Sequence, residues 1–359
     1  MKVTCKDKEY EVKEGTKIID VFRDEIETSE NKVITCICNN RIRSLNRIIS
    51  EDCSIELLDY THIEGKRVYI RGALFIMAMA FNEIYPEAMD TVNYQLSNSM
   101  YCEIDNMEVT NEMISNIKRK MQEIIDKNIE IRKVTMTKEE AKEFYSKAKY
   151  KRGLLQYDKE VNENCISLYY CENYYNYFFG VMPISTGVIS IFDIVRYKKG
   201  YLIKYPSRVN PKELAPFIEK KKLLSTFREY DDICKLLKIN TAYRLNKQVE
   251  KDGGKETIIL AEGLHEKKIS NIADKIVKNK DIKVVLIAGP SSSGKTTFAN
   301  RLRIQLMLNG KKPVTLSVDN YFVERENNPK DECGNFDFEC LEALDVDLLN
   351  NHLLSLLSG

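Results

Sequence analysis

A short segment rich in glycine and serine carries the residues that most clearly point to chemistry. It reads GPSSSGKT over residues 289–296 and fits the pattern G-x-x-x-x-G-K-[ST] at each fixed position. Gly289 and Gly294 permit backbone angles at which a Cβ would clash, so the amides between them can turn inward toward phosphate oxygens. The apolar run VVLIAG precedes the loop, and a helix-forming segment follows it. The pattern predicts a phosphate-binding loop between a buried strand and a helix.

The side chains of this loop indicate how a nucleoside triphosphate would be held. Lys295 is expected to reach the β- and γ-phosphates, and the Thr296 hydroxyl is expected to ligate Mg²⁺. Thr297 would lie near the α-phosphate. The residues predicted to bind the cofactor are Gly289, Ser291, Ser292, Ser293, Gly294, Lys295, Thr296 and Thr297. ATP and Mg²⁺ are therefore the predicted cofactors.

A second apolar segment, KPVTLSVD, ends at Asp319. The carboxyl ends of parallel strands line the ligand crevice of an α/β sheet, so we expect Asp319 to lie beside the phosphates. A carboxylate there could accept the proton of an attacking hydroxyl or hold Mg²⁺ through water. The simpler alternative is that Asp319 only caps the turn that follows.

Three stretches, GPSSSGKTTFANRL, SVDNYF and NFDFECLEALDVDLL, resemble the uridine kinase and phosphoribulokinase family in order and spacing. The resemblance implies a P-loop NTPase fold and phosphoryl transfer from ATP to a nucleoside hydroxyl, with Asp319 as the general base and Lys295 at the phosphates. It also implies that Tyr321 and Phe322 line the acceptor side and that Asp337 bonds sugar hydroxyls. The family usually reads F-D-H-P where this chain has FDFE, which puts uridine as the acceptor in question.

That family needs further strands and a lid that residues 283–359 do not supply. We therefore expect this segment to be the N-terminal part of a longer kinase domain, with little kinase activity of its own.

Residues 1–60 predict the element order β-β-α-β-β-β of a ubiquitin-like β-grasp, with a hairpin turning at Asn39 and Asn40. The stretches VKEGTKIIDVF and IELLDY resemble the TGS domain of threonyl-tRNA synthetases. This resemblance implies an RNA-binding or regulatory role. A docking module without a ligand is the alternative.

Residues 61–215 predict a mixed α+β domain, with a helix over residues 71–85 and helices capped by Thr110 and Thr137. The position of this segment and its stretch PISTGVISIFDIV resemble the second additional domain of threonyl- and alanyl-tRNA synthetases. That domain removes mischarged amino acids with a metal held by an H-x-x-x-H pair, a Cys and a His. The helix over residues 71–85 has no His, and Cys165 and Cys171 alone cannot build the site. The resemblance then implies a scaffold or a small-ligand module.

Residues 216–282 predict a charged helical connector, which completes an α/β multi-domain chain. The 55 basic and 54 acidic residues are balanced, so composition neither demands nor excludes nucleic acid. The basic stretches NIKRKMQ and SKAKYKR are explained by an RNA site or, more simply, by solvated helix faces. The polar N-terminus, an apolar run about half the roughly 20 residues that span a bilayer, and ten cysteines expected to be reduced all favour a cytoplasmic protein that does not enter a membrane.

A nucleoside kinase is accordingly the first functional prediction. The alternative is a nucleotide-switched RNA-binding or regulatory protein without kinase turnover. Metal-dependent tRNA editing is a third and weaker alternative.

Overall fold

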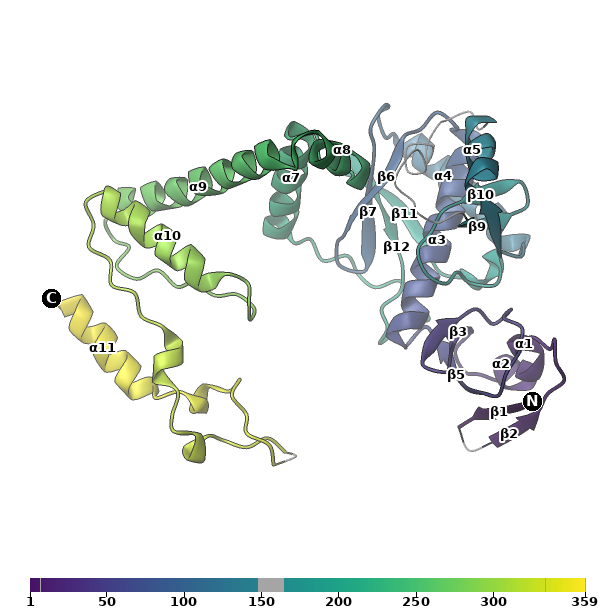
Figure 1. The fold of residues 1–359 in the computed structure, drawn as a ribbon, viewed down its shortest axis with the longest axis horizontal. Coiled ribbons are helices and arrows are strands. Elements are labelled where there is room, and N and C mark those ends of the chain that lie inside the picture. The colour runs from purple at the N-terminus through teal and green to yellow at the C-terminus, as the bar shows by residue number, and fades with distance from the viewer. Residues whose placement is uncertain (7, 148–164, 333, 359) are drawn as a thin grey trace. The chain divides into compact units, whose positions relative to one another are not determined.

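The chain folds into two compact units, Met1–Leu236 and Leu237–Gly359 (Figure 1). The computed structural model describes residues 1–6, 8–147, 165–332 and 334–358. The boundary between the units falls inside the segment that we predict to be a connector. Within the described ranges, no helix has the length and apolarity to cross a membrane. The protein is an α/β protein built from several sheets and many helices.

The N-terminal sheet has the predicted element order, except that the helix is broken at Phe22. Its elements are β1 (Lys2–Cys5), β2 (Lys8–Glu11), α1 (Ile18–Val21), α2 (Arg23–Glu27), β3 (Val33–Cys38), β4 (Arg41–Arg43) and β5 (Cys53–Asp59). The strands lie in the order β2-β1-β5-β3-β4, with β1 parallel to β5 and the other pairs antiparallel. Asn39 and Asn40 both have positive φ and form the predicted hairpin turn. Ile18, Phe22 and Cys36 are fully buried in the core of this sheet.

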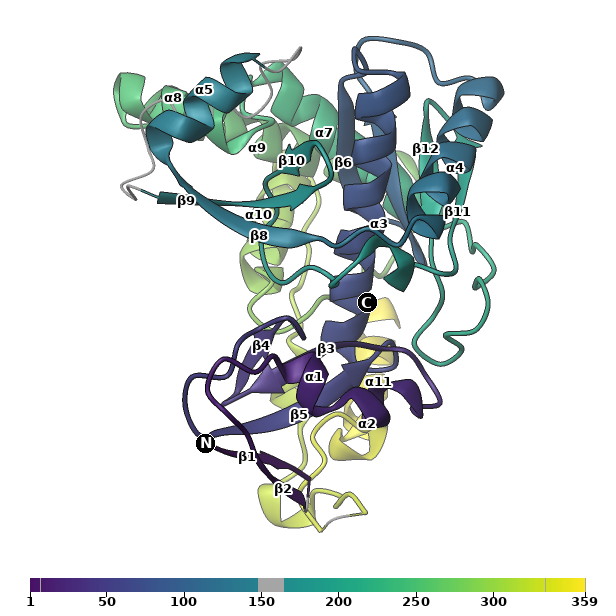
Figure 2. The ribbon, with the colours of Figure 1, turned by 90° about the vertical axis from the view of Figure 1, so that its right-hand side faces the viewer.

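Two further antiparallel sheets belong to the same unit (Figure 2). Their strands are β6 (Asp90–Gln95), β7 (Ser99–Ile104), β8 (Arg132–Thr137), β9 (Cys165–Cys171), β10 (Tyr174–Asn176), β11 (Asp193–Tyr197) and β12 (Gly200–Lys204). The helices are α3 (Ile63–Ile84), α4 (Asn111–Asp126), α5 (Lys138–Lys147), η1 (Thr186–Val188) and α7 (Lys221–Leu236). One sheet has the order β10-β9-β8 and the other β11-β12-β7-β6. Leu224 of α7 packs with Tyr101 and Leu202 of the second sheet.

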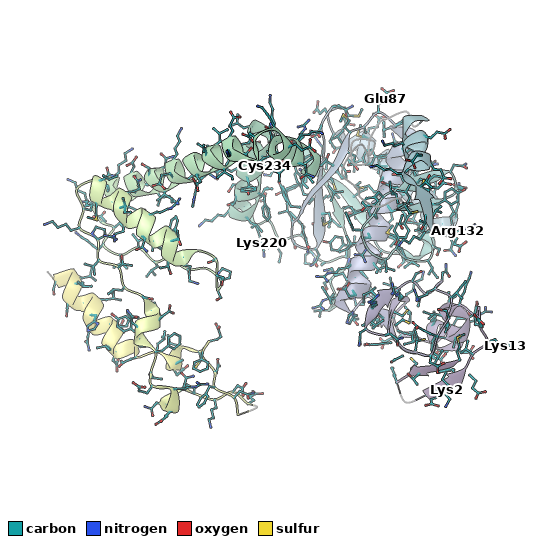
Figure 3. The ribbon with its side chains drawn as sticks, in the orientation of Figure 1. Lys2, Lys13, Glu87, Arg132, Lys220 and Cys234 are labelled. Carbon is teal, nitrogen blue, oxygen red and sulfur yellow. The ribbon has the colours of Figure 1, made fainter. Side chains whose placement is uncertain are left out.

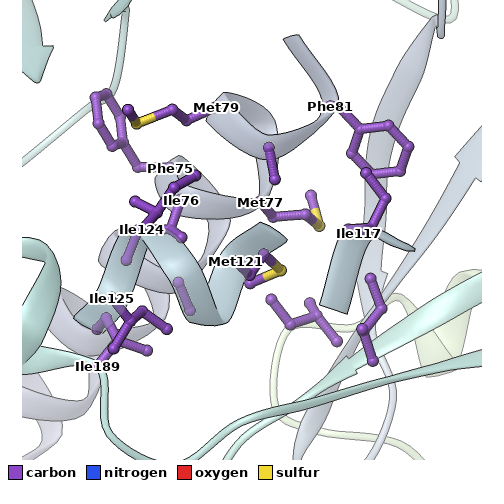
Figure 4. Packing of buried hydrophobic residues seen from close by; sticks show 14 of the residues in the cluster. Phe75, Ile76, Met77, Met79, Phe81, Ile117, Met121, Ile124, Ile125 and Ile189 are labelled. Atoms are coloured by element: carbon purple, nitrogen blue, oxygen red, sulfur yellow. The ribbon is translucent and has the colours of Figure 1, made fainter. Parts of the chain in front are cut away.

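The main core lies between α3, α4 and the sheet β11-β12-β7-β6 (Figure 4). Phe75 and Met77 of α3 pack in the same cluster as Ile117 and Met121 of α4, and these side chains are almost fully buried. The helix α4 is amphipathic, and its Thr110 cap accepts a hydrogen bond from the Met113 amide at 3.1 Å, as predicted.

The helix α3 begins eight residues before the start that we predict. Its N-terminus lies at Ile63 because the His62 ring nitrogen Nδ1 accepts the Glu64 amide at 3.2 Å and caps the first turn. Histidine is not among the residues that favour this position, so the start of α3 was difficult to predict from the sequence.

The second unit consists of helices and connecting segments. Its elements are α8 (Ala242–Asp252), α9 (Lys255–Lys278), α10 (Lys295–Leu308), η2 (Val318–Tyr321), η3 (Arg325–Asn327), η4 (Leu341–Ala343) and α11 (Val346–Ser358). Ile269 and Ala273 of α9 pack against Leu302 and Leu306 of α10 to form a small core.

The two strands predicted in this unit are absent from the described residues. Residues 283–289 and 312–317 have no strand pairing, and Asp319 lies in the short turn η2 rather than at a strand end. Leu286 is 88% exposed, although the sequence pattern predicts a strand buried on both faces. A strand is stabilised only by a neighbouring strand, and these two apolar segments do not pair with each other. The predicted parallel sheet is therefore wrong for the described part of this unit.

Candidate functional site

The phosphate loop keeps the backbone conformation that its glycines predict. Gly294 caps α10 in the left-handed region at φ 84°, and Ser292 also has positive φ at 56°. A Cβ added to Gly289 would lie 2.8 Å from the Ser293 hydroxyl oxygen, so a larger residue would fill the cradle. The first amides of α10 lack intrahelical acceptors, as at any helix N-terminus.

The Lys295 side chain folds back over this loop. Its ammonium donates to the carbonyls of Gly289 at 2.7 Å and Pro290 at 3.0 Å. The Ser293 amide donates to the Pro290 carbonyl at 3.2 Å and closes the turn. The loop therefore holds a lysine cation beside a helix N-terminus, which is the chemistry that a phosphate group needs.

The other predicted site residues lie in local contacts of their own. Asp319 accepts a hydrogen bond from the Ser317 hydroxyl at 3.4 Å, and the Tyr321 hydroxyl lies 3.0 Å from His352 Nδ1 of α11. Tyr321 is buried, whereas Phe322 is exposed and bridges to Leu344. In the described ranges, no hydrogen bond or ion pair links these residues to the loop.

Asp337 also has a local partner. Its carboxylate accepts the Glu339 amide at 2.9 Å, and its carbonyl accepts the Asn328 side chain at 2.9 Å. This arrangement organises a turn. The roles that the sequence assigns to Asp319, Tyr321, Phe322 and Asp337 stay predictions.

A cluster of three arginines in the first unit is a candidate site that the sequence analysis missed. Arg41 and Arg43 alternate along β4, and Arg47 follows in the next loop. We call these three residues the arginine patch. No carboxylate of the described residues lies within ion-pair distance of any of them. The Arg43 Nε atom is buried without a hydrogen-bond partner.

Arg43 and Arg47 lie close enough to the buried thiol of Cys36 to influence its charge. Burial raises the pKa of Cys36 to about 12, and the nearby charges of Arg47 and Arg43 lower it only in part. Asn46, between Arg43 and Arg47 in sequence, donates to Glu130 at 3.3 Å. Glu130 pairs at 2.9 Å with Arg132, which is labelled in Figure 3. The loop that carries Arg47 thus contacts the segment just before β8 through an acidic residue. The signal in the sequence was the spacing RIRSLNR, with no acidic residue among the arginines.

The basic stretch on α4 is neutralised instead. Lys118 pairs with Asp193 at 2.7 Å, and Lys120 pairs with Glu83 at 2.5 Å and Glu123 at 3.5 Å. This stretch is an ion-paired helix face, which favours the simpler of the two explanations. The second stretch, SKAKYKR, lies largely outside the described residues.

The region that resembles an editing domain is filled with apolar side chains along α3. Phe75 packs edge-on against Tyr174 and Phe178, with ring centroids 5.3 and 5.8 Å apart. Among the residues with described positions, no group of three His, Cys, Asp or Glu side chains is placed to hold a metal ion.

Comparison with curated proteins finds threonine–tRNA ligases. The ligase of Clostridium kluyveri is 29% identical over 174 residues, which cover 47% of this chain and 27% of the relative. A probable cytoplasmic threonine–tRNA ligase of Enterocytozoon bieneusi is 28% identical over 172 residues, or 48% and 26% of the two chains. The Thermoplasma volcanium enzyme is 26% identical over 187 residues, or 52% and 27%. This chain spans about a quarter of the length of these relatives. No protein-family model matches it.

These relatives contradict the prediction of a uridine kinase-like nucleoside kinase. They are ligases that act on threonine and tRNA, an enzyme class different from nucleoside kinases. A nucleoside substrate has no support from them. The physical reason for the error is that a phosphate loop recognises the phosphates of a nucleotide and carries no information about the acceptor. The comparisons instead point to a chain related to tRNA synthetases.

Proposed function

We propose that this chain is a nucleotide-switched tRNA-binding protein that does not phosphorylate nucleosides. The observation that carries the proposal is the similarity to threonine–tRNA ligases over about half of the chain. The resemblance of residues 1–60 and 61–215 to two domains of threonyl-tRNA synthetases supports the same interpretation. We assign tRNA binding to the unit Met1–Leu236 and nucleotide binding to Gly289–Thr297.

The arginine patch supplies the contacts that RNA requires. Guanidinium groups bind phosphate through paired N–H donors, and Arg41, Arg43 and Arg47 are not neutralised by described carboxylates. Each phosphate contact releases condensed counterions, so the affinity should fall as salt rises.

The phosphate loop fits a nucleoside triphosphate with Mg²⁺. Gly289 leaves room that a Cβ would fill, and Gly294 opens the helix N-terminus. Lys295 would hold the β- and γ-phosphates, Thr296 would hold Mg²⁺, and Thr297 would lie near the α-phosphate. On nucleotide binding, the Lys295 ammonium would leave the Gly289 and Pro290 carbonyls and contact the phosphates instead. That exchange is the local step by which the loop would respond to the nucleotide.

The first test measures tRNA binding by the full chain. Fluorescence anisotropy with a labelled tRNA transcript should give saturable binding that weakens as salt rises. The double variant Arg41→Gln/Arg47→Gln should bind at least tenfold more weakly. Arg23→Gln is the matched control, because Arg23 is an exposed arginine already paired with Asp20 at 3.0 Å. Equal affinity for both variants would contradict the assignment of the arginine patch.

The second test concerns the switch. A change in tRNA affinity on adding ATP and Mg²⁺ is expected to be about 5- to 150-fold, the usual range of coupling between two sites. The variant Lys295→Met should bind tRNA normally without ATP and should lose this response. ATP binding without any change in tRNA affinity would refute the switch while leaving tRNA binding intact.

A further inference from the structure

A cavity of about 300 Å³ opens on the first unit between the N-terminal sheet and the segment that follows η1. Tyr60 and Tyr69 line it together with Ile34, Val188 and Ile191, while Lys32 and Lys212 supply its cations. This volume is at the lower end of the range for small-molecule sites. The cavity shares no lining residue with the arginine patch or the phosphate loop.

Two tyrosine rings form a fixed aromatic wall. Their centroids are 4.8 Å apart and their planes are nearly perpendicular, at 89°. The Tyr60 hydroxyl donates to the Pro206 carbonyl at 2.7 Å. The Tyr69 hydroxyl donates to the Ile191 carbonyl at 2.8 Å and accepts the Ile191 amide at the same distance. Tyr60 and Tyr69 are only 5% and 4% exposed, so a small strip of apolar surface faces the cavity, and the bonded hydroxyls hold it in a single geometry.

Lys32 is a cation without a carboxylate partner in the described part of the chain. Its side chain is exposed, and its ammonium donates to the Gly187 carbonyl at 2.6 Å, which leaves two of its three donors available. Lys212 lies 3.3 Å from Glu30, but both side chains of this pair are mostly exposed, at 66% and 83%. An exposed pair of this kind contributes about 0–1 kcal/mol and can be exchanged for another anion.

We propose that this cavity binds a small planar organic anion, a single aromatic ring that carries one phosphate or carboxylate group. The ring would lie against Tyr60 and Tyr69, and the anionic group would accept hydrogen bonds from Lys32 and Lys212. The cavity is too small for a ligand with a long alkyl chain. Its two lysines outnumber its one acidic residue, Glu30, so neutral and cationic ligands are disfavoured.

Partial desolvation by the surrounding cavity lowers the pKa of the Lys32 ammonium from its ordinary value. An anion held at Lys32 would offset this desolvation and raise the pKa again. Binding should therefore be strongest below the lowered pKa of Lys32 and weaken as the pH rises through it.

The test uses phenyl phosphate and benzoate as probes of the full chain, with binding followed by ligand-observed NMR and calorimetry. We expect at least one probe to bind, and the preferred probe identifies the anionic group. Phenyl phosphate should bind at least tenfold more tightly than inorganic phosphate if it is the preferred probe, and benzoate should exceed acetate by the same factor if benzoate is preferred. Failure of both probes to bind would overturn the proposal.

Three variants locate the site. Lys32→Met should weaken binding at least tenfold, and Lys212→Met, on an exposed side chain that cannot disturb folding, should weaken it severalfold. Ser190→Trp should block the cavity while leaving both lysines in place. Lys13→Met, on an exposed lysine outside the cavity, should bind as the unchanged protein does. Binding that is unaffected by Lys212→Met and Ser190→Trp would overturn the proposal even if Lys32→Met failed to fold.

Discussion

The size of an individual side chain is most strictly limited where the backbones of two elements lie in contact. Gly65 lies on the first turn of α3, and a Cβ added there would be 1.8 Å from the Asp59 carbonyl oxygen of β5. The helix and the strand cannot keep their spacing with a larger residue between them. The close approach explains a glycine at a helical position, where glycine otherwise costs about 1 kcal/mol relative to alanine.

We therefore predict that Gly65→Ala destabilises the protein by about 1–3 kcal/mol, because the backbone must shift to relieve the overlap. Gly263→Ala is the matched control, since Gly263 lies in α9 with no atom within 4 Å of its added Cβ. The control should be neutral or stabilising by about 0.5–1 kcal/mol. Urea denaturation measures both free energies of unfolding. Equal values for the two variants would show that the contact between α3 and β5 yields easily.

Asp59, the residue of β5 that lies against Gly65, makes the stability of the protein depend on pH. Burial acts to raise the pKa of Asp59, but hydrogen bonds from Thr61, Asn31 and the His62 backbone outweigh it and hold the pKa below its ordinary value. Asp59 accepts both the Thr61 amide at 2.8 Å and the Thr61 hydroxyl at 2.6 Å. A lowered folded pKa stabilises the protein above 3.8, and this contribution is lost as the pH falls through the folded value.

We predict that the free energy of unfolding decreases below about pH 4, and that Asp59→Asn is less stable than the unchanged protein at pH 7 but shows a smaller decrease on acidification. Chemical denaturation at a series of pH values measures both curves. Parallel curves for the two proteins would show that Asp59 contributes nothing to the acid dependence.

At this scale, the sequence showed the phosphate loop but not the arginine patch. The loop is a contiguous pattern in which each fixed residue has a local geometric role, and Gly294 and Ser292 have the positive φ angles that it requires. The arginine patch depends on pairing instead. Whether an arginine is neutralised is decided by carboxylates distant in sequence, as Asp193 neutralises Lys118. Periodicity and composition do not contain that information.

At the scale of elements, local signals predicted what local interactions determine. The Thr137 amide donates to the Glu140 carboxylate at 2.7 Å, and the Glu140 amide donates to the Thr137 hydroxyl at 3.2 Å, so the predicted cap Thr137 forms a capping box with Glu140. The apolar segments 283–289 and 312–317 were predicted as strands and are not, because a strand depends on partners that a local pattern cannot supply. Helices satisfy their own backbone groups and were therefore easier to predict.

The cap of α4 gives a direct test of an element. We predict that Thr110→Ala destabilises the protein by about 1 kcal/mol, because the Met113 amide loses its acceptor. Thr110→Ser retains the side-chain oxygen and should remain within a few tenths of a kcal/mol of the unchanged protein. Thermal and urea unfolding, with α4 buried in the main core, should report the loss. A full effect in the serine variant would assign the role of Thr110 to its methyl group instead.

At the scale of the whole molecule, the sequence predicted an α/β protein of several domains but assigned it the wrong activity. The net charge of +1 averages over 109 charged residues and conceals the unpaired arginines of β4. The predicted kinase activity depended on the phosphate loop and the short stretches after it. The similarity to threonine–tRNA ligases extends over about half of the chain. In the account proposed here, the nucleotide regulates and the first unit binds RNA.

The measurement that tests this account most directly is the salt dependence of tRNA binding by the full chain. The logarithm of the association constant should fall linearly with the logarithm of the salt concentration. The slope should become shallower by about one for each patch arginine replaced, so by about two for Arg41→Gln/Arg47→Gln, with no change for Arg23→Gln. Absence of tRNA binding, or the same slope in all three proteins, would contradict the central claim.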